Sequence, residues 1–163
     1  MASTYTDLGI ELMATGENAG TWGTKTNNNL NLIEQLTGGF ATLSIAGGAG
    51  TQALDIDDGA LTGTAQQRVI EFTGSISGNR IITIPNDVET FYILKNSTTG
   101  ANTVQFKYAT GSGSSTTFSA TDKGTKIIYA TANDGTNPDI VDAMATSSEI
   151  SLANNNPVKF LDA

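Results

Sequence analysis

Short runs of β-branched and aromatic residues, separated by turn-forming residues, most strongly restrict the fold of this chain. Asp58-Gly59, Pro85-Asn86-Asp87 and Asn133-Asp134-Gly135 are typical of the turns between the runs. Short strands with no helical pattern between them predict a mainly β protein, built as a β-sandwich or a jelly-roll-like domain, and disfavour βαβ units. The predicted strands are Ala41–Ala46, Gln52–Ile56, Arg68–Thr73, Arg80–Ile84, Thr90–Leu94, Thr103–Tyr108, Ser115–Phe118, Lys126–Thr131 and Ile140–Val141.

The composition favours a folded chain with a thin apolar core. Of the 163 residues, 38% are hydrophobic, 7% are aromatic and 15% are charged, and 18 are glycine. Disordered chains usually combine low hydrophobicity with many charges, so the low charge content here points to a β protein rich in small and hydroxylated residues. The length fits one domain, and we expect neighbouring subunits to contribute to its burial.

One helix is predicted near the N-terminus, over residues 27–37. It is expected to begin near Thr26 or Asn27, whose side chains can cap free backbone N–H groups, and to end at Gly38-Gly39 in a left-handed cap. Leu30, Ile33 and Leu36 recur at helical spacing and form one apolar stripe, which must dock on something because so short a helix is marginal alone.

Three regions follow from these patterns: an N-terminal arm over residues 1–40, a β domain over 41–146 and a C-terminal arm over 147–163. No clean internal repeat is found, and the runs 70–72 and 81–84 are expected to be adjacent strands. The end of the C-terminal arm, Val158-Lys159-Phe160-Leu161, is too apolar to remain in solvent. It is expected either to return to the core or to pack on a neighbouring molecule.

Charge and missing residue types narrow the possible functions. The net charge is −8 and no basic run is present, which disfavours binding to nucleic acid or to an anionic membrane surface. The chain has no Cys and no His, which removes disulfides, thiolate nucleophiles and imidazole bases. We expect no enzymatic activity, no cofactor and no metal. Asp55–Gly59 and Asn133–Asp139 are oxygen-rich but lack the spacing of a calcium loop, so turns are expected there.

The sole tryptophan lies in the segment ELMATGENAGTWGTKTNNNLNLIEQ, between two glycines. Its large ring is expected either to plug the base of the β domain or to anchor an interface with another protein. The segment resembles the N-terminal module of tail-fibre-like virion structural proteins of marine and cyanobacterial phages. The likeness continues more weakly over residues 44–85, 92–107 and 121–129.

The resemblance implies a phage virion structural protein that docks through its N-terminal segment, as a tail-fibre-like protein, a fibre base or an adaptor. It also implies a homotrimer that is assembled with other virion proteins in the host cytoplasm and located in the virion. The residues expected at interfaces are Trp22, Gly23, Thr24, Asn29, Leu30, Ile33 and Phe160. A capsid decoration (cement) protein is the main alternative, and a glycan-binding module or an enzyme is the lesser one.

Overall fold

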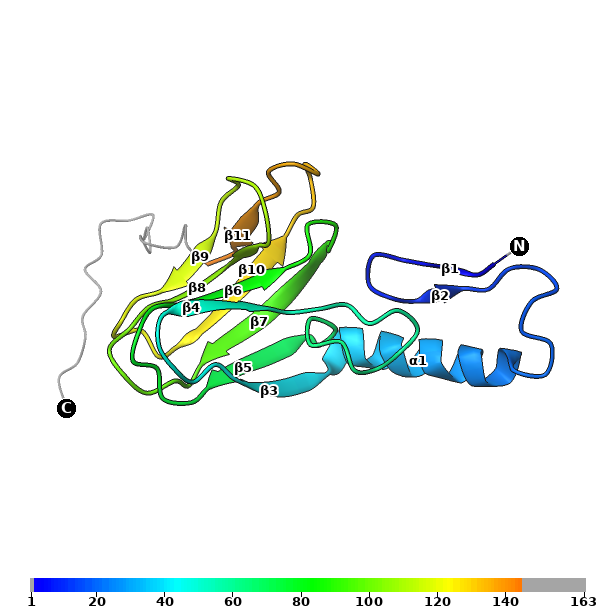
Figure 1. Ribbon diagram of the computed structural model, residues 1–163, viewed down its shortest axis with the longest axis horizontal. Helices are drawn as coiled ribbons and strands as arrows, with labels where there is room; N and C mark the ends of the chain where they lie inside the picture. The colour runs from blue at the N-terminus through cyan, green and yellow to red at the C-terminus, as the bar shows by residue number, and fades with distance from the viewer. Residues whose placement is uncertain (1, 145–163) are drawn as a thin grey trace, which may run out of the picture.

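The computed structural model describes residues 2–144, which form a β-sandwich with an arm at its N-terminal side (Figure 1). The mainly β class expected from the sequence is confirmed. The elements are β1 (Thr4–Tyr5), β2 (Glu11–Leu12), α1 (Trp22–Gly38), β3 (Phe40–Ser44), β4 (Gly50–Ala53), β5 (Val69–Thr73), β6 (Arg80–Ile84), β7 (Thr90–Asn96), β8 (Val104–Tyr108), β9 (Thr116–Phe118), β10 (Thr125–Ala130) and β11 (Ile140–Asp142).

The first six strands of the sandwich wind as a parallel coil. β3, β5 and β7 are parallel neighbours in one sheet, and β4, β6 and β8 are parallel neighbours in the other. The chain therefore changes sheet after every strand, and each pair of strands stacks on the pair before it. The runs 70–72 and 81–84, expected to be adjacent, instead lie in opposite sheets. Since jelly-roll strands are antiparallel, this winding matches the sandwich and not the jelly roll.

The segments that lead from one sheet to the other, which we call corners, also stack on one another. Gly47 bridges Ile76, and Ser75 bridges Thr99, both in parallel register. Gly74 and Gly100 have φ values of 99° and 97° at successive corners, a conformation that glycine adopts without strain. A Cβ at Gly100 would lie 2.2 Å from the carbonyl oxygen of Ile76, so a side chain there would force the corners apart.

Three antiparallel strands close the coil at its far end. β9 pairs with β8, β10 pairs with β7, and β11 pairs with β10, which gives sheet orders β4-β6-β8-β9 and β11-β10-β7-β5-β3. The backbone N–H of Ile140 donates to the carbonyl of Ser114 at 3.1 Å, which links β11 to the start of β9. One continuous core fills the space between the sheets, and Phe72, Tyr92 and Phe106 lie at its centre with ring centroids 5.7 and 6.5 Å apart.

The arm consists of the β1–β2 hairpin and α1, which lies beside it and runs directly into β3 (Figure 1). The predicted helix start was wrong, because the helix begins at Trp22, where the backbone N–H donates to the carbonyl of Asn18. The predicted left-handed cap was also wrong, since Gly39 is extended (φ −66°, ψ 147°) and leads straight into the strand. The arm thus ends at Gly39.

Candidate functional site: the two faces of the N-terminal helix

The inner face of α1 is attached to β2 mainly through polar groups. Asn29 accepts a hydrogen bond from the backbone N–H of Glu11 at 3.0 Å and donates one to its carbonyl at 2.8 Å. The ammonium of Lys25 lies 2.9 Å from the Glu11 carboxylate, which is 5% exposed as a residue. Leu32 and Leu36 are buried on the same face, at the spacing that places them beside Lys25 and Asn29.

This contact fixes the charges of its two members. The hydrogen bond from Lys25 holds the pKa of Glu11 below its ordinary value, and the same bond raises the pKa of Lys25. Asn18 adds a further hydrogen bond to the Glu11 carboxylate at 3.3 Å. The arm is therefore held by an ionised pair together with an amide that binds strand backbone.

The tip of the hairpin is anchored to the β domain by a buried glutamine. The Gln66 side chain donates to the carbonyls of Leu8 and Asp57 at 3.0 and 3.3 Å, and it accepts from the N–H of Asp57. The N–H of Gly59 donates to the carbonyl of Gly9 at 2.8 Å. These bonds join residues far apart in sequence and fix the hairpin, and α1 with it, to the sandwich.

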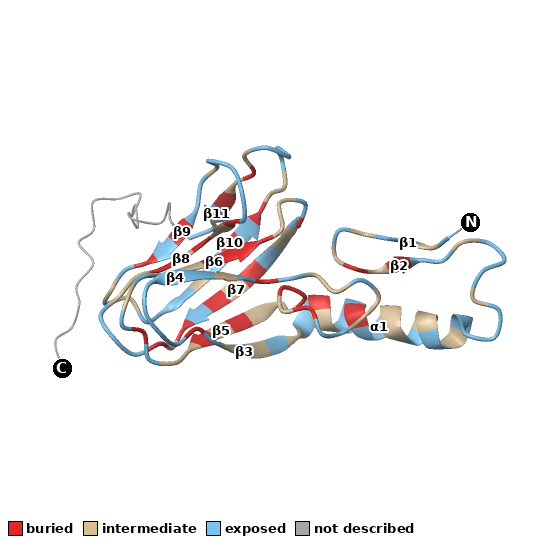
Figure 2. Ribbon diagram, in the orientation of Figure 1, coloured by how far each residue is buried: buried red, intermediate tan, exposed pale blue. Residues whose placement is uncertain are grey.

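The adjacent face of α1 carries three large apolar side chains that are open to solvent. Trp22 is 65% exposed, Leu30 is 58% exposed and Ile33 is 43% exposed. Figure 2 shows exposed positions, in pale blue, along the length of α1. At 100° per residue, these three positions fall within about 80° of the helix circumference. We call them the outer helix row. Trp22 does not plug the base of the β domain, so that alternative is excluded by the structure.

The other predicted interface residues are distributed differently. Gly23 and Thr24 lie in the first turn of α1, where Gly23 is half-buried and Thr24 is exposed. The Asn29 side chain instead lies on the inner face and forms hydrogen bonds to the backbone of β2. Leu36, predicted in one stripe with Leu30 and Ile33, belongs to the inner face. Phe160 lies outside the described residues. The sequence reasoning missed Glu11 and Gln66, since neither stands in a recognisable motif.

The acidic turns use their carboxylates to hold backbone. Asp55 accepts hydrogen bonds from the hydroxyl of Thr64 and from its backbone N–H, the latter at 3.0 Å, and these bonds lower the pKa of the Asp55 carboxyl. Asp139 accepts from the N–H of Ser114 at 2.7 Å, which lowers the pKa of the Asp139 carboxyl. Within residues 2–144, no group of three or more acidic side chains is arranged to hold a metal ion.

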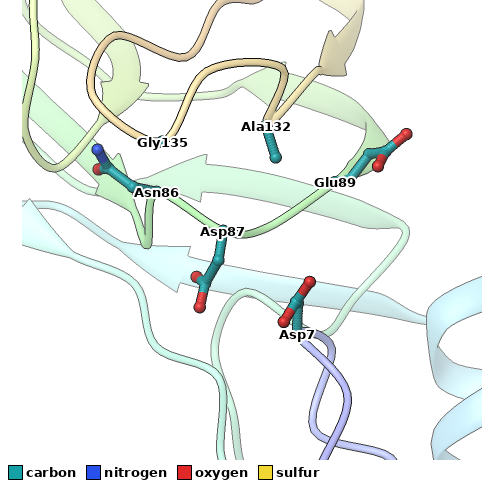
Figure 3. A pocket seen from close by; sticks show the side chains of 6 residues that line it. All are labelled: Asp7, Asn86, Asp87, Glu89, Ala132 and Gly135. Atoms are coloured by element: carbon teal, nitrogen blue, oxygen red, sulfur yellow. The ribbon is translucent and has the colours of Figure 1, made fainter.

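A shallow hollow of about 430 Å³ lies between the hairpin turn and the loop that connects β6 to β7. Figure 3 shows its lining residues, which are Asp7, Asn86, Asp87, Glu89, Ala132 and Gly135. Glu89 points away from the other two carboxylates and accepts a hydrogen bond from the Tyr129 hydroxyl at 2.8 Å. The carboxylates therefore do not converge on one point, and we assign no chemistry to the hollow.

Among the described residues, no helix combines the length and the apolar character needed to span a membrane. With no site assigned to the acidic turns or to the hollow, the candidate site is α1, which is held in place by its inner face and exposes the outer helix row to solvent. Comparison with known proteins gives no further guide: no protein family model, no curated protein and no solved structure matches this chain.

Proposed function

We propose that this protein is a structural component of a bacteriophage virion that docks on the particle through the outer helix row. The observation that carries the proposal is the exposure of Trp22, Leu30 and Ile33 on a helix whose other apolar residues are buried. The likeness of this segment to phage tail-fibre-like proteins supports the same role. We propose no catalytic function and no cofactor.

The physical case rests on preorganisation. The inner face of α1 is fixed by Lys25 and Asn29, so the outer row does not need to be ordered when a partner binds. Tryptophan is enriched among interface residues that dominate binding energy, and flanking apolar residues exclude water around such an anchor. A tryptophan that is 65% exposed contributes little to folding and is available for binding.

The proposal includes a homotrimer that occurs in the virion and is assembled with other virion proteins in the host cytoplasm. We favour a tail-fibre-like protein, a fibre base or an adaptor. Counting its copies per particle against the major capsid protein separates these roles from a decoration protein, which would be present in comparable number.

The test is the triple variant Trp22→Ala, Leu30→Ala, Ile33→Ala, measured both as free protein and in assembled particles. We expect the folded protein to keep its melting transition, because exposed positions change stability by about 0.5 kcal/mol or less each. We expect incorporation into virions to be lost, because interface anchors typically contribute about 2 kcal/mol or more each.

A matched control changes the polar side of the same helix, through Asn27→Ala, Asn31→Ala and Glu34→Ala, all at exposed positions. This control should be incorporated normally. Normal incorporation of the apolar triple variant would refute docking through the outer helix row, and a collapsed melting transition would show that the row has a structural role.

A further inference from the structure

The outer surface of the five-stranded sheet carries apolar side chains in two cross-strand rows. They alternate along the strands with core residues such as Ile70, Tyr92 and Ile128 (Figure 2). Ladder pairing aligns the first row across β3, β5, β7 and β10, and the second across β7, β10 and β11. We call this set the outer sheet face: Phe40, Val69, Ile93 and Ile127 in the first row, and Phe91, Tyr129 and Val141 in the second.

The face is exposed and has polar borders. Phe40, Phe91 and Val141 are 58%, 46% and 45% exposed. On one side, Lys95 and Glu71 form an ion pair at 2.8 Å, and on the other the Arg68 guanidinium lies 3.8 Å from the centre of the Phe91 ring. An apolar area enclosed by polar residues is typical of a surface that something covers.

The opposite sheet provides an internal comparison. Its outward positions on β4, β6, β8 and β9 that are exposed or half-buried are Thr51, Ala53, Ile81, Gln105, Lys107 and Thr117. Both sheets belong to the same winding and bury the same core, yet only one of them has a mainly apolar outer surface. The sheet architecture therefore does not require the apolar rows.

The chain itself supplies a suitable cover. β11 is the edge strand of the five-stranded sheet and contributes Val141 to the outer sheet face, and the sequence continues from it into residues 145–163. That segment has two alternating apolar pairs, Ile150 with Leu152 and Val158 with Phe160. Between them stands Asn154-Asn155-Asn156-Pro157, a composition typical of a turn.

The dimensions fit this segment better than a second copy of the protein. Five strands at about 4.8 Å spacing make a face roughly 19 Å wide, and two rows add about 10 Å in the other direction. This flat footprint, before the relief of the side chains is counted, is on the order of 200 Å². An interface between two copies typically buries roughly 800 Å² of accessible surface per partner and would have to extend well beyond this face. A segment of this length, at roughly 3.3 Å per residue, can cross such a face twice.

We propose that residues 145–163 fold back over the outer sheet face of their own chain, making two passes joined at Asn154–Pro157. One pass places Ile150 and Leu152 on the apolar rows, and the other places Val158 and Phe160 there. This inference concerns a surface separate from the outer helix row, so it stands or falls independently of docking on a virion.

Photocrosslinking of the full-length protein tests the contact. A photoreactive phenylalanine analogue at Phe91 should form crosslinks to residues 145–163, whereas the same analogue at Gln105, on the outer surface of the opposite sheet, should not. Irradiating a mixture of unlabelled and isotopically labelled protein distinguishes contacts within a chain from contacts between copies. Crosslinks that join two copies, or none to residues 145–163, would overturn the proposal.

A pair of full-length variants adds a second readout. Val158→Asp with Phe160→Asp should abolish the crosslink from position 91 and increase binding of an apolar dye such as ANS. Asn154→Asp with Asn156→Asp, which adds the same charge to the turn, should preserve the crosslink and leave dye binding low. An undiminished crosslink in the Val158 and Phe160 variant would also contradict the proposal.

Discussion

In the β domain the rings of Phe72, Tyr92 and Phe106 lie against one another, away from solvent, whereas in the arm the largest side chain, Trp22, is mostly exposed. The domain is held by a continuous apolar core. The arm buries Leu32 and Leu36 on its helix and otherwise depends on polar contacts at Glu11. This difference indicates that the arm's exposed apolar residues are not needed for folding.

The largest effect is expected from opening the core. Phe106 is fully buried and contacts both neighbouring rings, so Phe106→Ala should lower the free energy of unfolding by about 3–5 kcal/mol. Denaturant unfolding, followed by circular dichroism, measures the loss. Leu30→Ala is the control at an exposed apolar side chain and should change stability by about 0.5 kcal/mol or less. Equal losses in the two variants would remove the distinction between core and surface.

An intermediate effect is expected from a single buried hydroxyl. Tyr92 donates to the carbonyl of Ala65 at 2.8 Å, and burial raises the pKa of its phenol. Tyr92→Phe leaves that buried carbonyl without its partner and should cost about 1–3 kcal/mol. Tyr129→Phe, whose hydroxyl binds Glu89 at the surface, should cost little. If thermal denaturation ranks the two variants in reverse, the hydrogen bond to Ala65 does not stabilise the core.

The smallest effect should be confined to the arm and should depend on pH. The pKa of Glu11 is lowered on folding, because Lys25 and neighbouring side chains bind its ionised form. The stabilisation by this pair is therefore present above the unfolded value near 4.5 and is lost as the pH falls through the lower folded value. Amide-exchange protection of α1 should fall in acid before that of β7.

Glu11→Gln removes the titrating group and should lower the protection of α1 already at neutral pH, while reducing its dependence on acid. Glu34→Gln changes an exposed carboxylate on the same helix and is the matched control. Simultaneous loss of protection in α1 and β7 would mean that the arm and the β domain unfold as one unit. The arm would then not be held separately by its polar contacts.

Local sequence patterns located the strands but not their pairing. Each predicted run of the β domain coincides with a strand or overlaps one, because β-branched residues and turn residues act locally. Pairing in the winding joins residues far apart, such as Phe40 with Val69 and Val69 with Ile93, and alternation within a strand does not show which partner it has. The parallel coil could therefore not be predicted from the runs alone.

The candidate site was predicted in part for a similar reason. Helical spacing identified Leu30 and Ile33, but it could not separate them from Leu36, because the orientation of α1 is set by distant partners. Glu11 holds the helix and comes from a two-residue strand that carries almost no pattern of its own. The capping side chains of Thr26 and Asn27 also misplaced the helix start, because the helix extends back to Trp22 through Gly23, a weak helix former.

The parallel winding has a consequence for the order of folding. None of the strands from β3 to β8 pairs with the strand next to it in sequence, so each of these pairings closes a loop of roughly 25 to 30 residues before any ladder forms. Among the described strands of the sandwich, two antiparallel pairs join strands that are next to each other in sequence, and these are the only local hairpins: β8–β9 and β10–β11. The entropy of loop closure thus favours early structure at the C-terminal side of the sandwich, with the coil near the arm added afterwards.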